Sequence, residues 1–307
     1  MSKLDKIESL QRLIKQDSAN FQARRELAVL LIDSGFNEEA LQHLTYLSWN
    51  FENDEGIFYN LGIVYEKMKS LKKAKESYSK AIEINPEYSD AIYNLGLVLT
   101  ELKEYKNAIN CFNKIIEEDP EDSNTYFNLG LAYFKQKDYI NAIENFQSTI
   151  DINDEDLYAH FYLGNIFKEL GDIDSAIEQF EKVIEIAPNY SWAYFNLAAI
   201  YNEQGNIDAT IENLKMTIEM NPLDVEAYKL LTKLLIKKQS FKESVNVINT
   251  AISQCEETGD LDYLASLAYR SAGDTEKGIQ YLERAIRLYQ TLSIPVQTAK
   301  EELSKLK

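Results

Sequence analysis

An aromatic residue followed by asparagine is the pattern in this sequence with the clearest chemistry. It recurs at intervals of 34 residues, with tyrosine in place of asparagine at one of five positions. An asparagine side chain offers N–H donors and a carbonyl acceptor, and an aromatic ring offers a flat apolar surface. We therefore expect a row of such pairs to hydrogen-bond an extended peptide and to cover its side chains. The members of this ladder are Tyr59, Asn60, Tyr93, Asn94, Phe127, Asn128, Phe161, Phe195 and Asn196.

Residues suited to catalysis are few. The sequence contains no phosphate-binding glycine loop, no dinucleotide fingerprint and no HExxH zinc motif. Its two histidines, His43 and His160, leave little for metal or triad chemistry. His160 stands where Tyr126 and Tyr194 stand one period away, so we expect it to pack in the core. We expect no enzymatic activity, no cofactor and no metal.

A basic stripe offers a second kind of contact. Lys229, Lys233 and Lys237 follow i, i+4 spacing, so a helix would place them on one face. One hypothesis is that they bind a carboxylate of a partner, together with Arg270 one period further along. The alternative is a face that only keeps the protein soluble.

These side chains must be positioned by a repeated element of 34 residues. Within residues 123–156, Tyr126, Leu129, Gly130 and Tyr133 follow the i, i+3, i+4, i+7 pattern of an apolar helix stripe. Glycine inside a helix costs about 1 kcal/mol relative to alanine, so Gly130 needs a packing reason. Glycine recurs at Gly62, Gly96, Gly130 and Gly164, and a small residue recurs at Ala40, Ala74, Ala108, Ala142, Ala176, Thr210, Ser244 and Gly278. One unit cannot bury both its stripes, so the units must stack on their neighbours.

The repeat resembles the tetratricopeptide repeat (TPR) family, whose unit is a helix-turn-helix of this length. The resemblance implies an all-α, right-handed α-solenoid, or superhelix, of about eight units with capping helices at residues 1–20 and 293–307. The unit bounds are 21–54, 55–88, 89–122, 123–156, 157–190, 191–224, 225–258 and 259–292.

In this family the first helices of the units line an inner, concave wall, which places the ladder in a groove. Phe134, Tyr158 and Trp192 would add aromatic surface there. The arrangement is similar to the asparagine ladder of the O-linked N-acetylglucosamine transferases at Asn60, Asn94, Asn128 and Asn196, although their catalytic domain is absent. The alternative is that aromatic-Asn is generic repeat design and that the partner binds elsewhere.

The helix ends carry recognisable signals. Serines are expected to cap the first helices of three units, and prolines end four second helices. Glycine, or lysine in the middle units, marks the turn between paired helices. The capping serines are Ser89, Ser123 and Ser191; the turn residues are Gly35, Gly171, Gly205, Gly273, Lys69, Lys103 and Lys137. The eighth unit departs from the pattern, because Asp262 replaces the usual aromatic or aliphatic residue.

The net charge of −18 disfavours nucleic acid and anionic membranes as partners. Cys111 and Cys255 lie four units apart, too far for a disulfide between them, which favours a reducing compartment. The sequence shows no signal-peptide core and no membrane-spanning run. We therefore expect a cytoplasmic protein without membrane insertion.

The sequence thus predicts a non-enzymatic scaffold that binds an extended segment of another protein in its concave groove. The alternative is an assembly factor or co-chaperone-like adaptor that binds a folded partner, or itself, through its end units. The carboxylate clamp of chaperone adaptors is only partly matched, because Leu264 stands where that clamp has asparagine.

Overall fold

The computed structural model describes residues 2–307, and all regular secondary structure in that range is helical. The all-α prediction is therefore confirmed; the handedness and the number of units stay predictions. The first nine helices are α1 Lys3–Gln16, α2 Phe21–Asp33, α3 Asn37–Asn50, α4 Glu55–Lys67, α5 Leu71–Ile84, α6 Ser89–Glu101, α7 Tyr105–Glu118, α8 Ser123–Gln136 and α9 Tyr139–Ile152. The others are α10 Leu157–Leu170, α11 Ile173–Ile186, α12 Ser191–Glu203, α13 Ile207–Met220, α14 Val225–Lys237, α15 Phe241–Gln254, α16 Gly259–Ser271, α17 Thr275–Arg287, the 3₁₀ turn η1 Tyr289–Thr291 and α18 Val296–Leu306.

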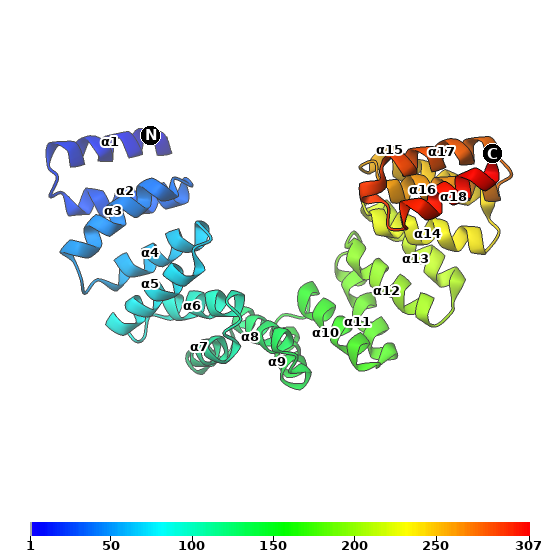
Figure 1. Ribbon diagram of the computed structural model, residues 1–307. Helices are drawn as coiled ribbons and strands as arrows, with labels where there is room; N and C mark the ends of the chain where they lie inside the picture. Colours follow the sequence, from blue (N-terminus) through cyan, green and yellow to red (C-terminus); the bar gives the residue numbers. More distant parts are fainter. Residues whose placement is uncertain (1) are drawn as a thin grey trace. The chain divides into compact units, whose positions relative to one another are not determined.

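Contacts follow the order of the chain. The chain divides into two compact units, the first ending at Ala159 and the second beginning at His160, inside α10. In the first unit each helix from α1 to α9 packs against the next, and in the second the same holds from α11 to α18 (Figure 1). The apolar core therefore consists of layers between successive helices, as expected of stacked helical repeats.

The recurring glycines make room for close helix packing. A Cβ atom placed on Gly62 would lie 2.3 Å from the Tyr78 ring, and one on Gly130 would lie 3.0 Å from the Phe146 ring. Gly96 and Gly164 face Phe112 and Phe180 in the same way. The aromatic residue of each second helix thus fills the space that the glycine of the first helix leaves open. This packing explains why glycine recurs inside these helices.

The turns between paired helices are also as predicted. Gly171 has a φ of +80°, and Lys137 ends α8 with a φ of +64°, both in the left-handed region. Glycine adopts this region without strain, whereas lysine does so at a cost. Gln239, which the sequence analysis did not single out, also has a positive φ of 61°. The other turn residues in this region are Gly35, Gly205, Gly273, Lys69 and Lys103.

The predicted serine caps are wrong by one residue. Ser89, Ser123 and Ser191 are the first residues of α6, α8 and α12, and the residue before each one is the N-cap. Before α8 that residue is Asp122, whose carboxylate accepts from the backbone N–H groups of Asn124 and Thr125. A carboxylate at this place satisfies the free N–H groups and complements the helix dipole, so the serine is not needed as a cap.

The N-terminal helix is shorter than predicted. Residues 1–20 were expected to form one helix, but α1 ends at Gln16, and Asp17 then accepts from the backbone N–H of Ala19 in a turn. Met1 lies outside the described residues. Ile7 and Leu10 are the buried residues of α1, whereas Leu13 is 43% exposed. At the other end α18 begins after Pro295 and buries Ala299.

Candidate functional site

In the compact part that ends at Ala159, hydrogen bonds between the first helices of successive repeats hold the ladder together. Nδ2 of Asn128, on α8, donates to the Tyr93 hydroxyl on α6 at 2.8 Å and to the Asn124 carbonyl at 2.9 Å. Nδ2 of Asn94 donates to the Tyr59 hydroxyl on α4 at 3.3 Å. Each asparagine therefore contacts the tyrosine 35 residues before it. The amide N–H groups brace neighbouring first helices and are not fully available to a ligand.

The ladder rings lie at the edge of the core. Tyr59, Tyr93 and Phe127 are half-buried, and each packs against the aromatic ring on the second helix of its own hairpin. The ring centroids are 5.9 Å apart for Tyr59–Tyr78, 6.0 Å for Tyr93–Phe112 and 5.6 Å for Phe127–Phe146. In the second unit Phe161 packs against Phe180 at 5.9 Å. These rings thus serve packing on one edge and present the other outward.

Burial and nearby charge affect the tyrosines of the ladder. Burial raises the pKa of Tyr93, the Asp122 carboxylate raises it further, and the hydrogen bond from Asn128 opposes both. The pKa of Tyr59 is raised for similar reasons, with Asp90 as the neighbouring carboxylate. Both hydroxyls therefore keep their protons at neutral pH and can donate a hydrogen bond.

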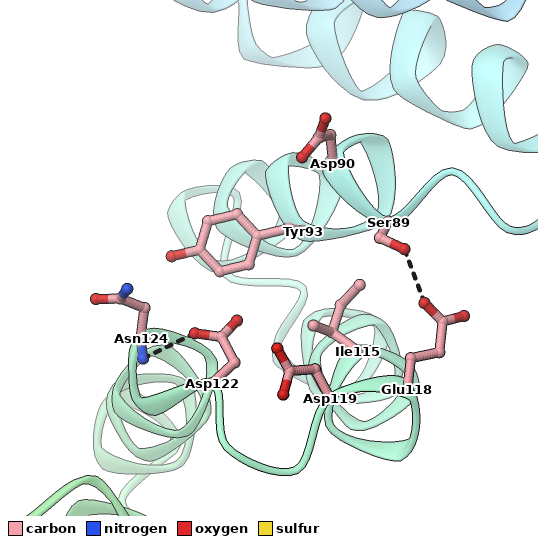
Figure 2. A pocket seen from close by; sticks show the side chains of 8 residues that line it. All are labelled: Ser89, Asp90, Tyr93, Ile115, Glu118, Asp119, Asp122 and Asn124. Carbon is pink, nitrogen blue, oxygen red and sulfur yellow. Dashed lines mark hydrogen bonds between the residues drawn. The ribbon is translucent and has the colours of Figure 1, made fainter. Parts of the chain in front are cut away.

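A cavity of about 520 Å³ opens beside Tyr93, between α6, α7 and the start of α8. Figure 2 shows the Tyr93 ring on one side and Asn124 with Asp122 on the facing side. The Ser89 hydroxyl donates to Glu118 at 2.7 Å, which ties the start of α6 to the end of α7. The cavity is lined by Ser89, Asp90, Tyr93, Ile115, Glu118, Asp119, Asp122 and Asn124.

The chemistry of this cavity is acidic. Four of its eight lining residues are carboxylates, and none of these described residues is a lysine or an arginine. None of these four carboxylates was among the predicted site residues. A signal was present in the acidic run Glu117–Asp122, which surrounds Pro120 in the turn before α8. The fold brings that turn beside Tyr93, a proximity the linear sequence does not show.

Other predicted groove residues differ in their surroundings. Asn60 donates to the Gly56 carbonyl within its own helix at 2.8 Å. Asn196 was expected to face the groove, but it is buried, with its amide donating to the Trp192 carbonyl and its Oδ1 accepting from Lys168 Nζ at 2.6 Å. Because Asn196 is buried and each end of its side chain already makes a hydrogen bond, little of it is open to a ligand. Its place in the groove stays a prediction.

The remaining aromatic residues fall into two groups. Tyr158 and Trp192 are 53% and 55% exposed, so each presents a large apolar surface within its own unit. Trp192 lies 6.4 Å from Phe195 on the same helix. Phe134 is half-buried near the end of α8 and packs against Tyr139 at the start of α9.

Two of the four predicted carboxylate-binding residues, Lys229 and Arg270, pair with carboxylates of the chain itself. Lys229 pairs with Glu226 at 2.9 Å and with Asp260 at 3.2 Å, and only 17% of its side chain is exposed. Arg270 pairs with Glu302 of α18 at 2.7 Å. Lys233 and Lys237 are exposed. The four cations therefore do not converge on one open carboxylate site.

The histidines and cysteines have ordinary structural surroundings. His160 is buried, with its Nδ1 2.8 Å from Oε1 of Gln179, which confirms its expected place in the core. Cys111 and Cys255 are free thiols, and burial raises the pKa of Cys111 to about 11. Residues 2–307 contain no cluster of three or more His, Cys, Asp or Glu side chains placed to hold a metal. No helix in the same range combines the length and apolar character needed to cross a bilayer.

Comparisons with known proteins agree with this architecture. Tetratricopeptide repeat models match residues 57–88, 77–110 and 263–291, and a TPR repeat model matches residues 164–205. A model of anaphase-promoting complex, cyclosome, subunit 3 matches residues 101–183. A comparison with curated proteins found no match.

Solved structures show the same fold. MamA 41-end from Desulfovibrio magneticus RS-1 is 27% identical over 56% of this chain and 97% of its own, with a TM-score of 0.54. The MamA RS-1 ArsTM double mutant is 28% identical over 55% of this chain and 94% of its own, with a TM-score of 0.53. A tetratricopeptide repeat protein from Parabacteroides merdae ATCC 43184 covers 82% of this chain and 98% of its own, with a TM-score of 0.55 and 17% identity, and supports the fold alone.

The stacked hairpins, with small residues opposite aromatic rings, define a helical repeat protein. The matching family models identify the chain as a member of the tetratricopeptide repeat family. Proteins of this family are generally non-catalytic scaffolds, and this chain is a scaffold for protein–protein interaction. Its partners are proteins.

Proposed function

We propose that the chain binds an extended segment of a partner protein along the face formed by α4, α6 and α8, without catalysing a reaction. The observation that carries this proposal is the pairing of Asn128 with Tyr93 beside the acidic cavity. The pair is hydrogen-bonded, half-buried and next to open space, which favours a preorganised binding surface.

One hydrogen-bond donor on Tyr93 and one acceptor on Asn128 are not used in the bond between them, and together they match a peptide backbone. The Tyr93 oxygen accepts from Asn128, which leaves its O–H proton with no acceptor in the described part of the chain. Oδ1 of Asn128 likewise has no donor among these residues. Every residue of an extended segment other than proline carries one N–H and one C=O. Asn128 would accept from that N–H and Tyr93 would donate to that C=O.

The cavity would receive a side chain of the bound segment. Its volume of about 520 Å³ is large enough for a long side chain, and the Tyr93 ring and Ile115 provide apolar contact. The surrounding carboxylates favour a segment of net positive charge, because opposite potentials attract across an interface. Binding should therefore weaken as salt is added, which screens charges over about 10 Å at 0.1 M.

A selection experiment would test the proposal even though the natural partner is unidentified. Peptides selected from a displayed random library against the full chain should lose affinity about 2- to 12-fold for Tyr93→Phe, since one hydrogen bond is worth about 0.5–1.5 kcal/mol. Tyr105→Phe is the matched control, because Tyr105 lies on α7 outside the cavity lining. Equal losses for both variants, or no loss for either, would contradict the proposed face.

A further inference from the structure

Asp262 occupies a place that the repeat normally gives to an aromatic ring. One and two periods earlier the same position holds Tyr228 and Tyr194, both buried. Asp262 is equally buried, with 1% of its surface exposed. A buried carboxylate costs stability unless charge and hydrogen bonds compensate it, so its presence in a core slot requires an explanation.

The compensation around Asp262 is incomplete. Nε of Arg284, on α17, lies 3.2 Å from Oδ2 of Asp262. No donor among the described residues makes a well-aligned hydrogen bond to either carboxylate oxygen. Arg284 is also shared, because its Nη2 contacts Glu257 in the segment before α16. One guanidinium therefore serves two carboxylates, of which only Asp262 is buried.

The charged and titratable groups around Asp262 come from α17 and from the segment before α16. Tyr281, Arg284 and Arg287 approach from α17, and Glu257 approaches from the chain before α16. Burial and Glu257 raise the pKa of Asp262, Arg284 and Arg287 oppose them, and the result is a pKa of about 6. This lies well above the ordinary value of 3.8.

We propose that the α16–α17 pair is a pH-responsive element in which proton uptake by Asp262 tightens the packing of the two helices. The carboxyl takes one proton from solvent, becomes neutral in its buried position and releases Arg284 to Glu257. At higher pH the buried charge returns and the pair opens more readily. The region would respond to mild acidification, whereas the rest of the array need not respond.

The direction follows from linkage between proton binding and stability. A carboxyl whose pKa is higher in the closed state than in the open state binds protons preferentially when closed. Its stabilising contribution is complete below pH 3.8 and is lost as the pH rises through about 6. This gain on acidification is the reverse of the usual behaviour of a salt-bridged aspartate.

Hydrogen exchange of the full chain tests the proposal through Asp262→Asn, which keeps the size of the side chain and removes its charge. The backbone amides of α16 and α17 should exchange faster in the wild type than in this variant, after correction for intrinsic exchange rates. The ratio of the two rates should be roughly 100 at pH 7.5 and roughly 10 at pH 5. Glu276→Gln is the matched control, because it removes an exposed carboxylate from α17. It should leave this pH dependence unchanged.

Arg284→Met supplies a second readout that a purely structural role would not give. Arg284 lowers the pKa of Asp262, so removing it should raise that pKa. The pH at which α16 and α17 finish losing their exchange protection should therefore be higher in Arg284→Met than in the wild type. A pH-independent ratio between wild type and Asp262→Asn would overturn the proposal. An unshifted transition in Arg284→Met would do the same.

Discussion

Asn128 illustrates how a single side chain joins two helices of the array. It donates to Tyr93 on the previous first helix and to a carbonyl of its own helix. Asn128→Ala should lower the free energy of unfolding by about 0.5–1.5 kcal/mol, the net value of a hydrogen bond, partly offset by the better helix propensity of alanine. Denaturant unfolding measures the change. Asn113→Ala, on the exposed face of α7, should change stability by less than about 0.5 kcal/mol, and equal losses would contradict the bracing role.

The recurring glycines should differ in their tolerance of a methyl group. A Cβ on Gly62 would lie 2.3 Å from the Tyr78 ring, whereas one on Gly130 would lie 3.0 Å from Phe146. Gly62→Ala should destabilise by about 1–3 kcal/mol through overpacking. Gly130→Ala should be much closer to neutral, because alanine regains about 1 kcal/mol of helix propensity. Thermal melting of the two variants decides this, and an equal cost would show that the rings move freely.

At the scale of the helix, the turn residues explain where each first helix ends. Lys137 has a φ of +64°, a region that favours glycine by about 1 kcal/mol. Lys137→Gly should therefore stabilise the protein by up to about 1 kcal/mol in chemical denaturation. Lys135→Gly, two residues earlier and inside α8, should destabilise by about the same amount. A loss of stability in Lys137→Gly would mean that the lysine side chain has a role the backbone does not explain.

Helices and turns could be predicted well because their signals are local. The 34-residue period, the apolar helix stripes and the left-handed turn residues can be read directly from the sequence. The sequence showed that the recurring glycines need a packing reason, but it did not identify the aromatic rings that they face. The caps of α6, α8 and α12 could not be placed to the residue, because serine and the preceding residue compete for the N-cap. The charge of Asp122 decides that competition before α8.

The candidate site was harder to predict, because it depends on contacts between successive units. Tyr93 and Asn128 could be identified from the sequence, but their polar groups were expected to be open to a ligand. The structure brings the two residues within 2.8 Å, although they are 35 positions apart. The acidic lining and the burial of Asn196 were missed for the same reason, since each depends on a neighbouring helix. Lys229 and Arg270 also face carboxylates from later helices, which the spacing of the basic residues does not reveal.

For the whole molecule, the central claim is that an extended segment binds the face of α4, α6 and α8 beside Tyr93. Photo-cross-linking tests this most directly, using a selected peptide that carries a photoreactive group and the full chain. Mass spectrometry should find the cross-links at residues lining the cavity, such as Tyr93 and Asn124, and Tyr93→Phe should reduce their yield in proportion to its loss of affinity. Cross-links confined to the second helices α3 and α5, or to α1 and α18, would contradict the account.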